Sequence, residues 1–286
     1  MIAPAVEPRR LRVGGIERRI LSAGSPDSPP LVLLHGIAGS ADEWQGVMPG
    51  LAQRYRVYAP DAPGHGHSDK PRPLDGHRYD VPGYTESTLD VLDALGVHRS
   101  PLVALSGGGP VALTLALDQP DRVSQLVLVD AAGLGREVSW DYRMASLPGA
   151  QLAFRLGLSP KRSERFGRRL LYDQTKLPPG WVERRLAIWS TAGATEAFFT
   201  TVRNSLTLRG QRVTFTHRLD EISQPTLIIW GRQDPIIPVR HALAAARRIP
   251  NARLHVFDRC GHVPLWEYPD EFVRLLLDFL DQPGAT

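Results

Sequence analysis

The strongest constraint on the fold of this chain is a sequence pattern in which short runs of β-branched and apolar residues alternate with segments of helical spacing. The runs occupy residues 30–36, 55–61, 101–106, 125–130, 225–231 and 252–258. Helical spacing of apolar residues follows at 80–95, 108–117, from about residue 239, and at 270–280. Alternation of this kind predicts an α/β fold with a parallel sheet, and each of the first four runs is predicted to be a strand buried on both faces. Around Gly14-Gly15, two further β-prone stretches predict an antiparallel hairpin at the sheet edge.

This alternation of strand-like runs and helical segments is interrupted once. From about residue 133 to about residue 218, the apolar runs give way to helical stretches rich in Arg and punctuated by Pro148, Pro160 and Pro178. Residues 136–218 hold fifteen Lys and Arg against six Asp and Glu, although the net charge of the whole chain is only +4. We therefore predict one α/β core that carries a single helical insertion.

Composition excludes several classes of protein. A chain with 42% hydrophobic and 22% charged residues is neither disordered nor collagen-like. No segment approaches the roughly 18 consecutive apolar residues of a membrane span, and residues 1–15 lack the apolar stretch of an export signal. The single cysteine, Cys260, cannot form a disulfide within the chain. We expect a cytoplasmic protein with a small-molecule substrate and with no membrane or nucleic-acid partner. The basic run at 159–169 is expected to be a solvated helix face, and the oligomeric state is left open.

Polar side chains follow the predicted strands at the points where they end. In open α/β sheets, ligands bind beyond the carboxyl ends of the strands, so the chemistry is expected there. The residues at these ends are His35, Asp61, Ser106, Asp130, Asp234 and His262. This set contains a nucleophile, a base and several candidate acids.

Ser106 stands where a buried run passes into the glycine-rich turn at 107–109. The local sequence ALSGG is a variant of the G-x-S-x-G nucleophile elbow, with Ala104 in place of the first glycine. Small neighbours permit the strained turn that exposes such a serine. The pentapeptide alone equally fits a serine that caps the following helix.

Asp234 and His262 each follow a later predicted strand, which gives the chain order Ser, Asp, His. That order is the one found in Ser-Asp-His hydrolases of α/β type, and its three members fall at three strand ends. Asp130 is a second candidate for the acid, because it too ends a strand after the serine; we favour Asp234. The structural alternatives are an Asp-Pro turn at Asp234 and a loop histidine bonded to backbone at His262.

Five segments together resemble the α/β-hydrolase superfamily, in its lidded esterase and carbon-carbon hydrolase branches. They are HGIAGS at 35–40, DAPGHGHSD at 61–69, the Ser106 turn, WGRQDPIIP at 230–238 and CGHVPLWEYP at 260–269. The resemblance implies an eight-stranded, mostly parallel sheet with a helical cap after strand six. We place the core at 1–132 and 219–286 and the cap, or lid, at 133–218. In this family the 61–69 segment is generally structural, so His65 and His67 are expected to be loop residues.

The resemblance also implies roles for the site residues. Ser106 would be the nucleophile, His262 the base and Asp234 the acid, with the backbone N–H groups of Ile37 and Gly107 as the oxyanion hole. Gly107 is often a larger residue in the family, so its N–H is expected to be more open and less fixed by packing. No cofactor or metal is expected, because HExxH, paired CxxC and G-x-G-x-x-G motifs are missing, and His35, His65 and His67 lack a partner motif.

Two features of the sequence point to different substrates. Residues 172–186 look like the cap segment of the meta-cleavage-product hydrolases, which split carbon-carbon bonds, and Arg185 falls where those enzymes carry a substrate-binding arginine. Those enzymes usually have a polar residue before the nucleophile and often Trp after the histidine, whereas this chain has Leu105 and Val263. An apolar wall favours a simple ester.

We therefore predict a carboxylesterase for small to medium hydrophobic esters that works through an acyl-enzyme on Ser106. A carbon-carbon hydrolase and a non-catalytic ligand-binding protein are the alternatives, and lactone or amide chemistry stays open. The aromatic residues of the cap are predicted to lie mostly in its core, and a cap of this composition would place an apolar roof over Ser106. They are Trp140, Phe154, Phe166, Trp181, Trp189, Phe198 and Phe199.

Overall fold

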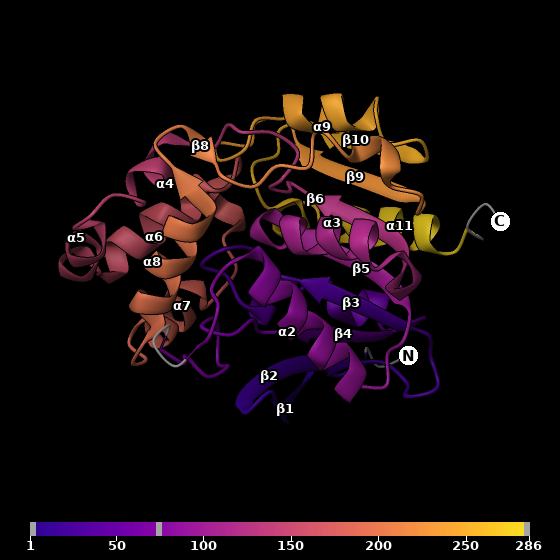
Figure 1. Cartoon of the computed structure of the whole chain (residues 1–286), viewed down its shortest axis with the longest axis horizontal. Helices are drawn as coiled ribbons and strands as arrows, with labels where there is room; N and C mark the ends of the chain where they lie inside the picture. The colour runs from indigo at the N-terminus through magenta and orange to yellow at the C-terminus, as the bar shows by residue number, and fades with distance from the viewer. Residues whose placement is uncertain (1–3, 73–75, 283–286) are drawn as a thin grey trace.

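One eight-stranded sheet forms the core of the molecule (Figure 1). The structure, a computed structural model, describes residues 4–72 and 76–282. The strands are β1 (Glu7–Val13), β2 (Ile16–Ala23), β3 (Pro30–Leu34), β4 (Arg56–Pro60), β5 (Ser100–Leu105), β6 (Val123–Val129), β9 (Thr226–Gly231) and β10 (Ala252–Phe257). Their order is β1-β2-β4-β3-β5-β6-β9-β10, and only β2 runs opposite to the other seven strands. The predicted mostly parallel, eight-stranded sheet is confirmed.

The two edges of the sheet differ in structure. At one edge, Gly14 and Gly15 have φ of 58° and 78°, a left-handed conformation that suits glycine and closes the β1-β2 hairpin. At the other edge, most residues of β10 are only half-buried. The reason is its position: a strand paired on one side only is not covered by neighbours as β5 or β6 is.

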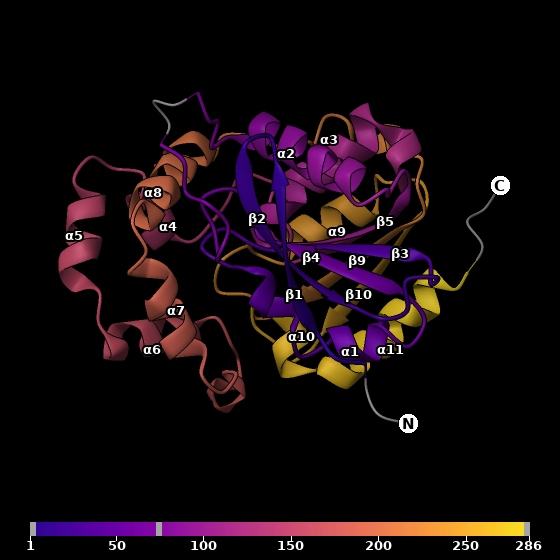
Figure 2. The same cartoon turned by 90° about the horizontal axis from the view of Figure 1, so that it is seen from below.

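Helices cover both faces of the sheet. Figure 2 shows α2 (Val81–Ala94) and α3 (Gly109–Asp118) on one face and α1 (Met48–Leu51) and α11 (Pro269–Leu280) on the other. The Asp80 side chain caps α2 by accepting a hydrogen bond from the Gly83 N–H. The remaining core helices are η1 (Ala41–Trp44), η3 (Ser106–Gly108), η4 (Pro120–Arg122), η6 (Leu219–Glu221), α9 (Arg240–Ala246) and α10 (Pro264–Glu267).

The chain between β6 and β9 forms a helical body at one end of the sheet (Figure 1). We call residues 133–218 the helical insertion. It contains α4 (Trp140–Met144), α5 (Ala150–Gly157), α6 (Pro160–Arg169), η5 (Gln174–Lys176), α7 (Trp181–Trp189), α8 (Ala194–Ser205) and a hairpin of β7 (Leu206–Thr207) and β8 (Gly210–Gln211). Within residues 4–72 and 76–282, no helix combines the length and the hydrophobicity needed to cross a membrane.

Aromatic packing holds the helical insertion together. Phe154 lies 4.8 Å from Trp189 and 6.0 Å from Phe198, centroid to centroid, so α5, α7 and α8 share one aromatic cluster. Trp140, at the first residue of α4, lies outside this cluster, and its side chain is 62% exposed. On α6, Arg168 and Arg169 pair with Glu164 and Asp141 at the surface.

Candidate active site

Ser106 occupies a strained turn between β5 and α3. Its φ is 49°, in the left-handed region that a serine rarely adopts. The surrounding backbone is packed too closely for larger residues. A Cβ at Gly108 would lie 2.9 Å from the carbonyl oxygens of Leu34 and His35, and one at Gly109 would lie 2.7 Å from that of Ala132. The glycines at 108 and 109 therefore allow the sharp turn that presents the Ser106 hydroxyl beyond the sheet.

The structure brings Ser106, His262 and Asp234 into one hydrogen-bonded chain. His262 Nε2 lies 2.9 Å from Ser106 Oγ, and His262 Nδ1 lies 2.8 Å from Asp234 Oδ2. The other Asp234 oxygen accepts hydrogen bonds from the N–H groups of Ile236 and Ile237, at 2.7 and 3.1 Å. These bonds fix the carboxylate, which in turn orients the imidazole so that Nε2 faces the hydroxyl.

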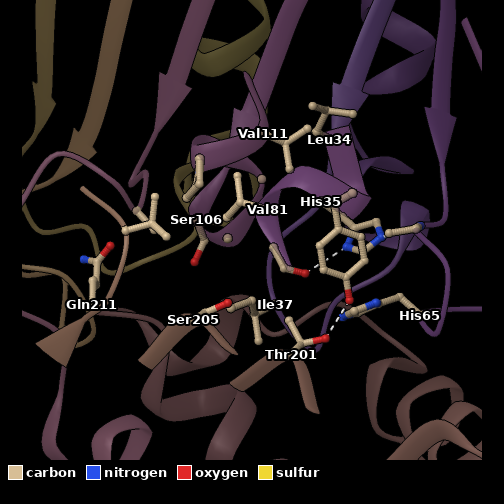
Figure 3. A pocket seen from close by; sticks show the side chains of 18 of the residues that line it. Leu34, His35, Ile37, His65, Val81, Ser106, Val111, Thr201, Ser205 and Gln211 are labelled. Atoms are coloured by element: carbon tan, nitrogen blue, oxygen red, sulfur yellow. Dashed lines mark hydrogen bonds between the residues drawn. The ribbon is translucent and has the colours of Figure 1, made fainter. Parts of the chain in front are cut away.

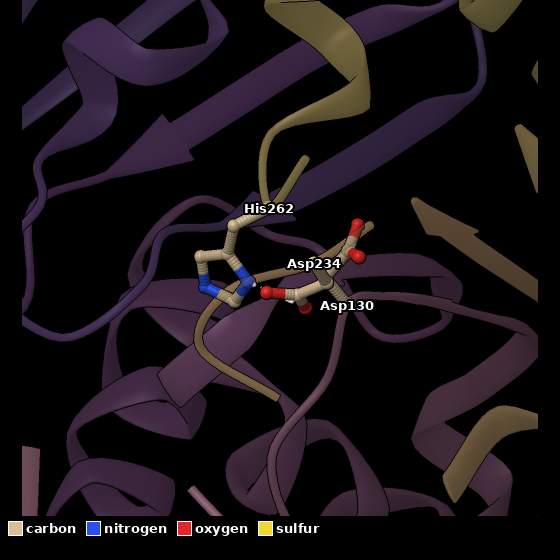
Figure 4. Close-up of side chains that lie close together, drawn as sticks. All are labelled: Asp130, Asp234 and His262. Atoms are coloured by element: carbon tan, nitrogen blue, oxygen red, sulfur yellow. Dashed lines mark hydrogen bonds and ion pairs between the residues drawn. The ribbon is translucent and has the colours of Figure 1, made fainter. Parts of the chain in front are cut away.

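Asp130, the second candidate acid, lies beside Asp234 but is not bonded to His262 (Figure 4). Its side chain is fully buried, and Oδ1 accepts the N–H of Gly231 at 2.9 Å, while Oδ2 has no partner among the described residues. Burial, followed by the charge of Asp234, raises the pKa of Asp130 well above its usual range. Both causes disfavour the charged form of Asp130.

The ligand atoms of Asp130, Asp234 and His262 lie within 4.8 Å of one another, which is near enough to hold a metal ion. Three of the four carboxylate oxygens already accept hydrogen bonds, from backbone N–H groups or from His262. We interpret the cluster as a hydrogen-bonded network that positions His262.

The loop that carries His262 is tied to the helical insertion, a feature that the sequence did not reveal. The His262 N–H donates to the carbonyl of Leu170 at 2.7 Å. The buried Glu267 accepts from Gly261 N–H at 2.6 Å and from Asp173 N–H at 2.8 Å, and so bridges this loop to the chain after α6. A Glu five residues after a loop histidine carries no recognisable motif, so only the folded chain identifies it.

Ile37 and Gly107, the predicted oxyanion-hole residues, are in direct contact. A Cβ at Gly107 would lie 2.5 Å from Ile37 Cγ1 and 2.7 Å from Ile37 N. The expectation that Gly107 is loosely packed is therefore wrong, because the Ile37 side chain fills the space that a larger residue at 107 would need. Ile37 N–H has no backbone acceptor among the described residues, and Gly107 N–H is at the start of η3, where amides lack intrahelical partners.

Two cavities meet at Ser106. The first, which we call the apolar chamber, lies toward α2, α3 and the β7-β8 hairpin, as Figure 3 shows in part. Aliphatic side chains form most of its wall: Leu34, Val81, Val111, Val138, Leu206, Val213, Ile236 and Ile237. Thr201, Ser205 and Gln211 contribute polar atoms on the side of the insertion.

The second cavity, which we call the arginine chamber, lies between the Ile37 loop and α7. Leu105, Arg185 and Val263 all line it, together with His262 and Trp181. The structure thus gathers the three predicted substrate residues around one space next to Ser106. Glu43 and Tyr142 also line it, and neither was identified from sequence because an isolated Glu or Tyr in such segments has no motif.

The remaining predicted histidines support the loops around the site. His35 Nε2 accepts the Ala62 N–H at 3.0 Å, so its Nδ1 carries the proton and donates to the Gly36 carbonyl at 2.8 Å. His65 Nδ1 bonds the Pro63 carbonyl at 3.1 Å, and burial lowers the pKa of His65 to about 3. The half-exposed His67 donates its backbone N–H to Asp61, which also pairs with Arg19.

Comparison with known proteins places this chain in a family. A family profile described as the alpha/beta hydrolase fold matches residues 29–269. An uncharacterised protein of Mycobacterium tuberculosis is 37% identical over 94% of this chain and 80% of its own length. A 2-hydroxy-6-oxo-6-phenylhexa-2,4-dienoate hydrolase of Burkholderia cepacia is 32% identical over 87% of each chain. The crystal structure of a bacterial membrane phospholipase A superposes with a TM-score of 0.81 at 27% identity, over 96% of this chain and 86% of that one.

Proposed function

The chain belongs to the alpha/beta hydrolase family, and we propose that it is a serine hydrolase that cleaves carboxylic esters through an acyl-enzyme on Ser106. The observation that carries this proposal is the relay of 2.9 and 2.8 Å from Ser106 through His262 to Asp234, on a strained turn at the junction of two cavities. A serine hydroxyl needs an adjacent base at neutral pH, and this geometry supplies one.

The proposed reaction follows from the positions of these groups. Ser106 Oγ attacks the carbonyl carbon while His262 Nε2 takes its proton, and Asp234 stabilises the resulting imidazolium. The N–H groups of Ile37 and Gly107 donate to the oxyanion, each contributing about 3 kcal/mol by analogy with measured oxyanion holes. His262 then returns the proton to the leaving alcohol, and a water molecule hydrolyses the acyl-enzyme by the same steps.

We further propose that residues 133–218 act as a lid and that the apolar chamber holds the hydrophobic part of the ester. The apolar chamber has aliphatic walls, which suit alkyl or aromatic groups, and the helical insertion supplies one side of it through Leu206 and Val213. The family includes a phospholipase A among its structural relatives, and that name denotes cleavage of an ester.

A carbon-carbon hydrolase is the second candidate, because Arg185 faces the chamber next to Ser106 and the 32% identical Burkholderia cepacia relative is named as a dienoate hydrolase. A guanidinium in that place suits the acid end of such a substrate. Against this candidate, Leu105 and Val263 give the same chamber two buried apolar walls. We therefore rank the ester first.

The deciding experiment compares turnover of 4-nitrophenyl esters of increasing acyl length with turnover of 2-hydroxy-6-oxo-6-phenylhexa-2,4-dienoate. Ester cleavage that exceeds dienoate cleavage in kcat/KM supports the first proposal, and the opposite order supports the second. Labelling with a fluorophosphonate separates both from a ligand-binding protein without turnover. Such a protein need not activate Ser106, so a lack of label at Ser106 would contradict the serine hydrolase itself.

A further inference from the structure

The apolar chamber has one polar wall that the proposed reaction does not use. Thr201 and Ser205 lie about one turn apart on α8, so both side chains fall on the same face of that helix. His65, in the loop after β4, lines the chamber as well. In Figure 3 these three side chains lie on one side of the cavity, and the aliphatic Leu34 and Val111 lie on the other. The chamber therefore offers polar atoms to one side of a bound acyl group.

His65 holds one ring nitrogen against the backbone and leaves the other free. Nδ1 lies 3.1 Å from the Pro63 carbonyl oxygen. A carbonyl only accepts, so Nδ1 carries the hydrogen and Nε2 has a lone pair. Nε2 has no hydrogen-bond partner within residues 4–72 and 76–282, and it is not sealed in as His241 Nδ1 is. Because burial lowers the pKa of His65 to about 3, the ring stays neutral at pH 7 and Nε2 stays an acceptor.

Tyr84 adds a second acceptor to this wall. Its ring packs edge-on against the His65 ring, with centroids 5.7 Å apart, and its hydroxyl oxygen lies 2.6 Å from Thr201 Oγ1. Thr201 has one hydrogen, which it donates to the Ala197 carbonyl at 2.9 Å, so Tyr84 is the donor to Thr201. The Tyr84 oxygen therefore keeps a lone pair and has no hydrogen left to give. A ligand group that bonds to His65 or Tyr84 must supply the hydrogen.

The charges near this wall favour a neutral donor. Arg18 also lines the chamber; its Nε and one Nη donate to the Asp61 carbonyl at 3.0 and 2.8 Å, and its other Nη donates to Ser87. The positive charge of Arg18 disfavours an ammonium group, and the lone pairs of His65 and Tyr84 disfavour a carboxylate. A hydroxyl group meets both conditions, because it is neutral and carries one hydrogen to donate.

We propose that His65 Nε2 accepts a hydrogen bond from a hydroxyl group on the acyl part of the ester. The inference rests on the proposed function and specifies its substrate class: esters of hydroxylated acids, whose hydroxyl reaches the polar wall while the ester carbonyl lies at Ser106. His65 determines specificity in this proposal and takes no part in breaking the ester bond.

The physical basis is the cost of an unpaired polar group in an apolar cavity. A hydroxyl that enters the chamber loses its hydrogen bonds to water, and His65 Nε2 replaces one of them. A methyl group or a methyl ether at the same place on the chain has no hydrogen to donate, so it leaves Nε2 without a partner. The chamber should therefore distinguish a hydroxyl from both groups.

Calorimetric titration measures this preference without turnover, with amides in place of esters. The probes are 6-hydroxyhexanamide, 8-hydroxyoctanamide and 10-hydroxydecanamide, so that one chain length places the hydroxyl at the polar wall. Each is compared with its methyl ether and with the amide in which a methyl group replaces the hydroxyl. In the wild-type protein the best hydroxy amide should bind about tenfold more tightly than its methyl ether, the effect of one lost hydrogen bond in a buried site. It should also bind at least as tightly as the more hydrophobic methyl counterpart.

Nitrogen NMR of the histidine rings reports the contact directly. In nitrogen-15-labelled protein, His65 Nε2 should resonate as an unprotonated ring nitrogen and Nδ1 as a protonated one. Binding of the hydroxy amide should move the Nε2 signal toward the protonated range, whereas the methyl ether should not. An Nε2 signal that stays in place when the hydroxy amide binds would overturn the proposal.

Variants assign the preference to one ring. His65→Phe keeps an aromatic ring against Tyr84 and removes Nε2, so the tenfold preference for the hydroxyl over the methyl ether should be lost. His67→Phe is the matched control, because this ring belongs to the same loop, is 42% exposed and is not part of the wall of either chamber. It should keep the preference within about twofold. Thermal unfolding of both variants verifies that they are folded.

Two binding results would also overturn the inference: equal affinity for hydroxy amides and methyl ethers at every chain length in the wild-type protein, or the same preference in wild type and His65→Phe. The first comparison needs no variant, so the inference stays testable if His65→Phe does not fold. Because binding is measured without cleavage, a protein that prefers the hydroxy amides but cleaves no ester refutes only the proposed function. Ester cleavage without any preference for the hydroxyl refutes only the role of His65.

Discussion

The sheet side and the insertion side of the candidate site are held in different ways. On the sheet side, Asp234 and His262 have hydrogen-bond partners that fix them, and Ser106 is constrained by its strained backbone. On the insertion side, Arg185 packs against aromatic faces, and its Nε has no hydrogen-bond partner in the part of the chain that the structure describes. A group with its partners in place is pre-organised for one reaction, whereas a group that lacks one is available to a ligand.

We infer from this difference that the sheet side of the site carries out the reaction and that the insertion side selects the substrate. Substitutions on the sheet side should lower turnover of every substrate by a similar factor. Substitutions on the insertion side should separate one substrate from another. The four predictions that follow test this division.

The largest effect is expected for Ser106→Ala. Removal of the nucleophile leaves only the oxyanion hole and substrate binding, so kcat for 4-nitrophenyl butyrate should fall by about 10³- to 10⁶-fold, and by a similar factor for longer esters. Ser124→Ala, a half-buried serine near the start of β6, is the matched control and should stay within about twofold of wild type. Activity of Ser106→Ala near the wild-type level would show that Ser106 is not the nucleophile.

Asp234→Asn and Asp130→Asn distinguish the two neighbouring acids. Loss of the Asp234 carboxylate disturbs the tautomer of His262, which should lower kcat by about 10²- to 10⁴-fold. Asp130 makes no hydrogen bond to His262, and its burial disfavours the charged form, so Asp130→Asn should cost less than about tenfold. Steady-state kinetics on one ester measures both, and a larger loss in Asp130→Asn would assign the acid to Asp130.

The strands of the core and the three residues of the Ser106 relay could be predicted from the sequence. Each parallel strand from β3 to β10 in the core sheet falls on its own run of apolar residues, and Ser106, Asp234 and His262 each follow such a run. Because parallel strands have their carboxyl ends at one edge of the sheet, local patterns were enough to predict that these three residues lie close together.

What the sequence could not predict depends on contacts between distant segments. Glu43 acquires its environment from Gly36, Trp266 and the opposite wall of the arginine chamber, which no local pattern specifies. The tight packing of Gly107 depends on the side chain of Ile37, seventy positions earlier in the chain. Edge position, which left β10 half-buried, likewise follows from strand order and not from the composition of the strand.

Gly107→Ala probes the sheet side with a single methyl group. That methyl would meet Ile37 N at 2.7 Å, closer than real Cβ contacts, so one or both oxyanion donors must move. Loss of one such donor costs about 10²- to 10³-fold in other hydrolases, and a displaced donor should cost about 10- to 100-fold in kcat for all esters. Gly46→Ala is the control, because the added methyl would have no described residue within 4 Å apart from its neighbours along the chain. If Gly107→Ala keeps full activity, these two residues do not form the oxyanion hole.

The smallest effect on a neutral ester is expected for Arg185→Ala, because this change removes a group from the insertion side alone. A neutral ester has no charge for the guanidinium to bind, so kcat/KM for 4-nitrophenyl butyrate should change less than about threefold. An anionic dienoate would lose a charge-assisted bond of about 1.5 to 3 kcal/mol, which corresponds to about 10- to 150-fold in kcat/KM. Arg165→Ala, at an exposed position on α6, controls for the loss of a basic side chain from the insertion. An equal loss on both substrates would show that Arg185 supports the structure of the insertion through its aromatic contacts, and the division between the two sides of the site would then fail at this residue.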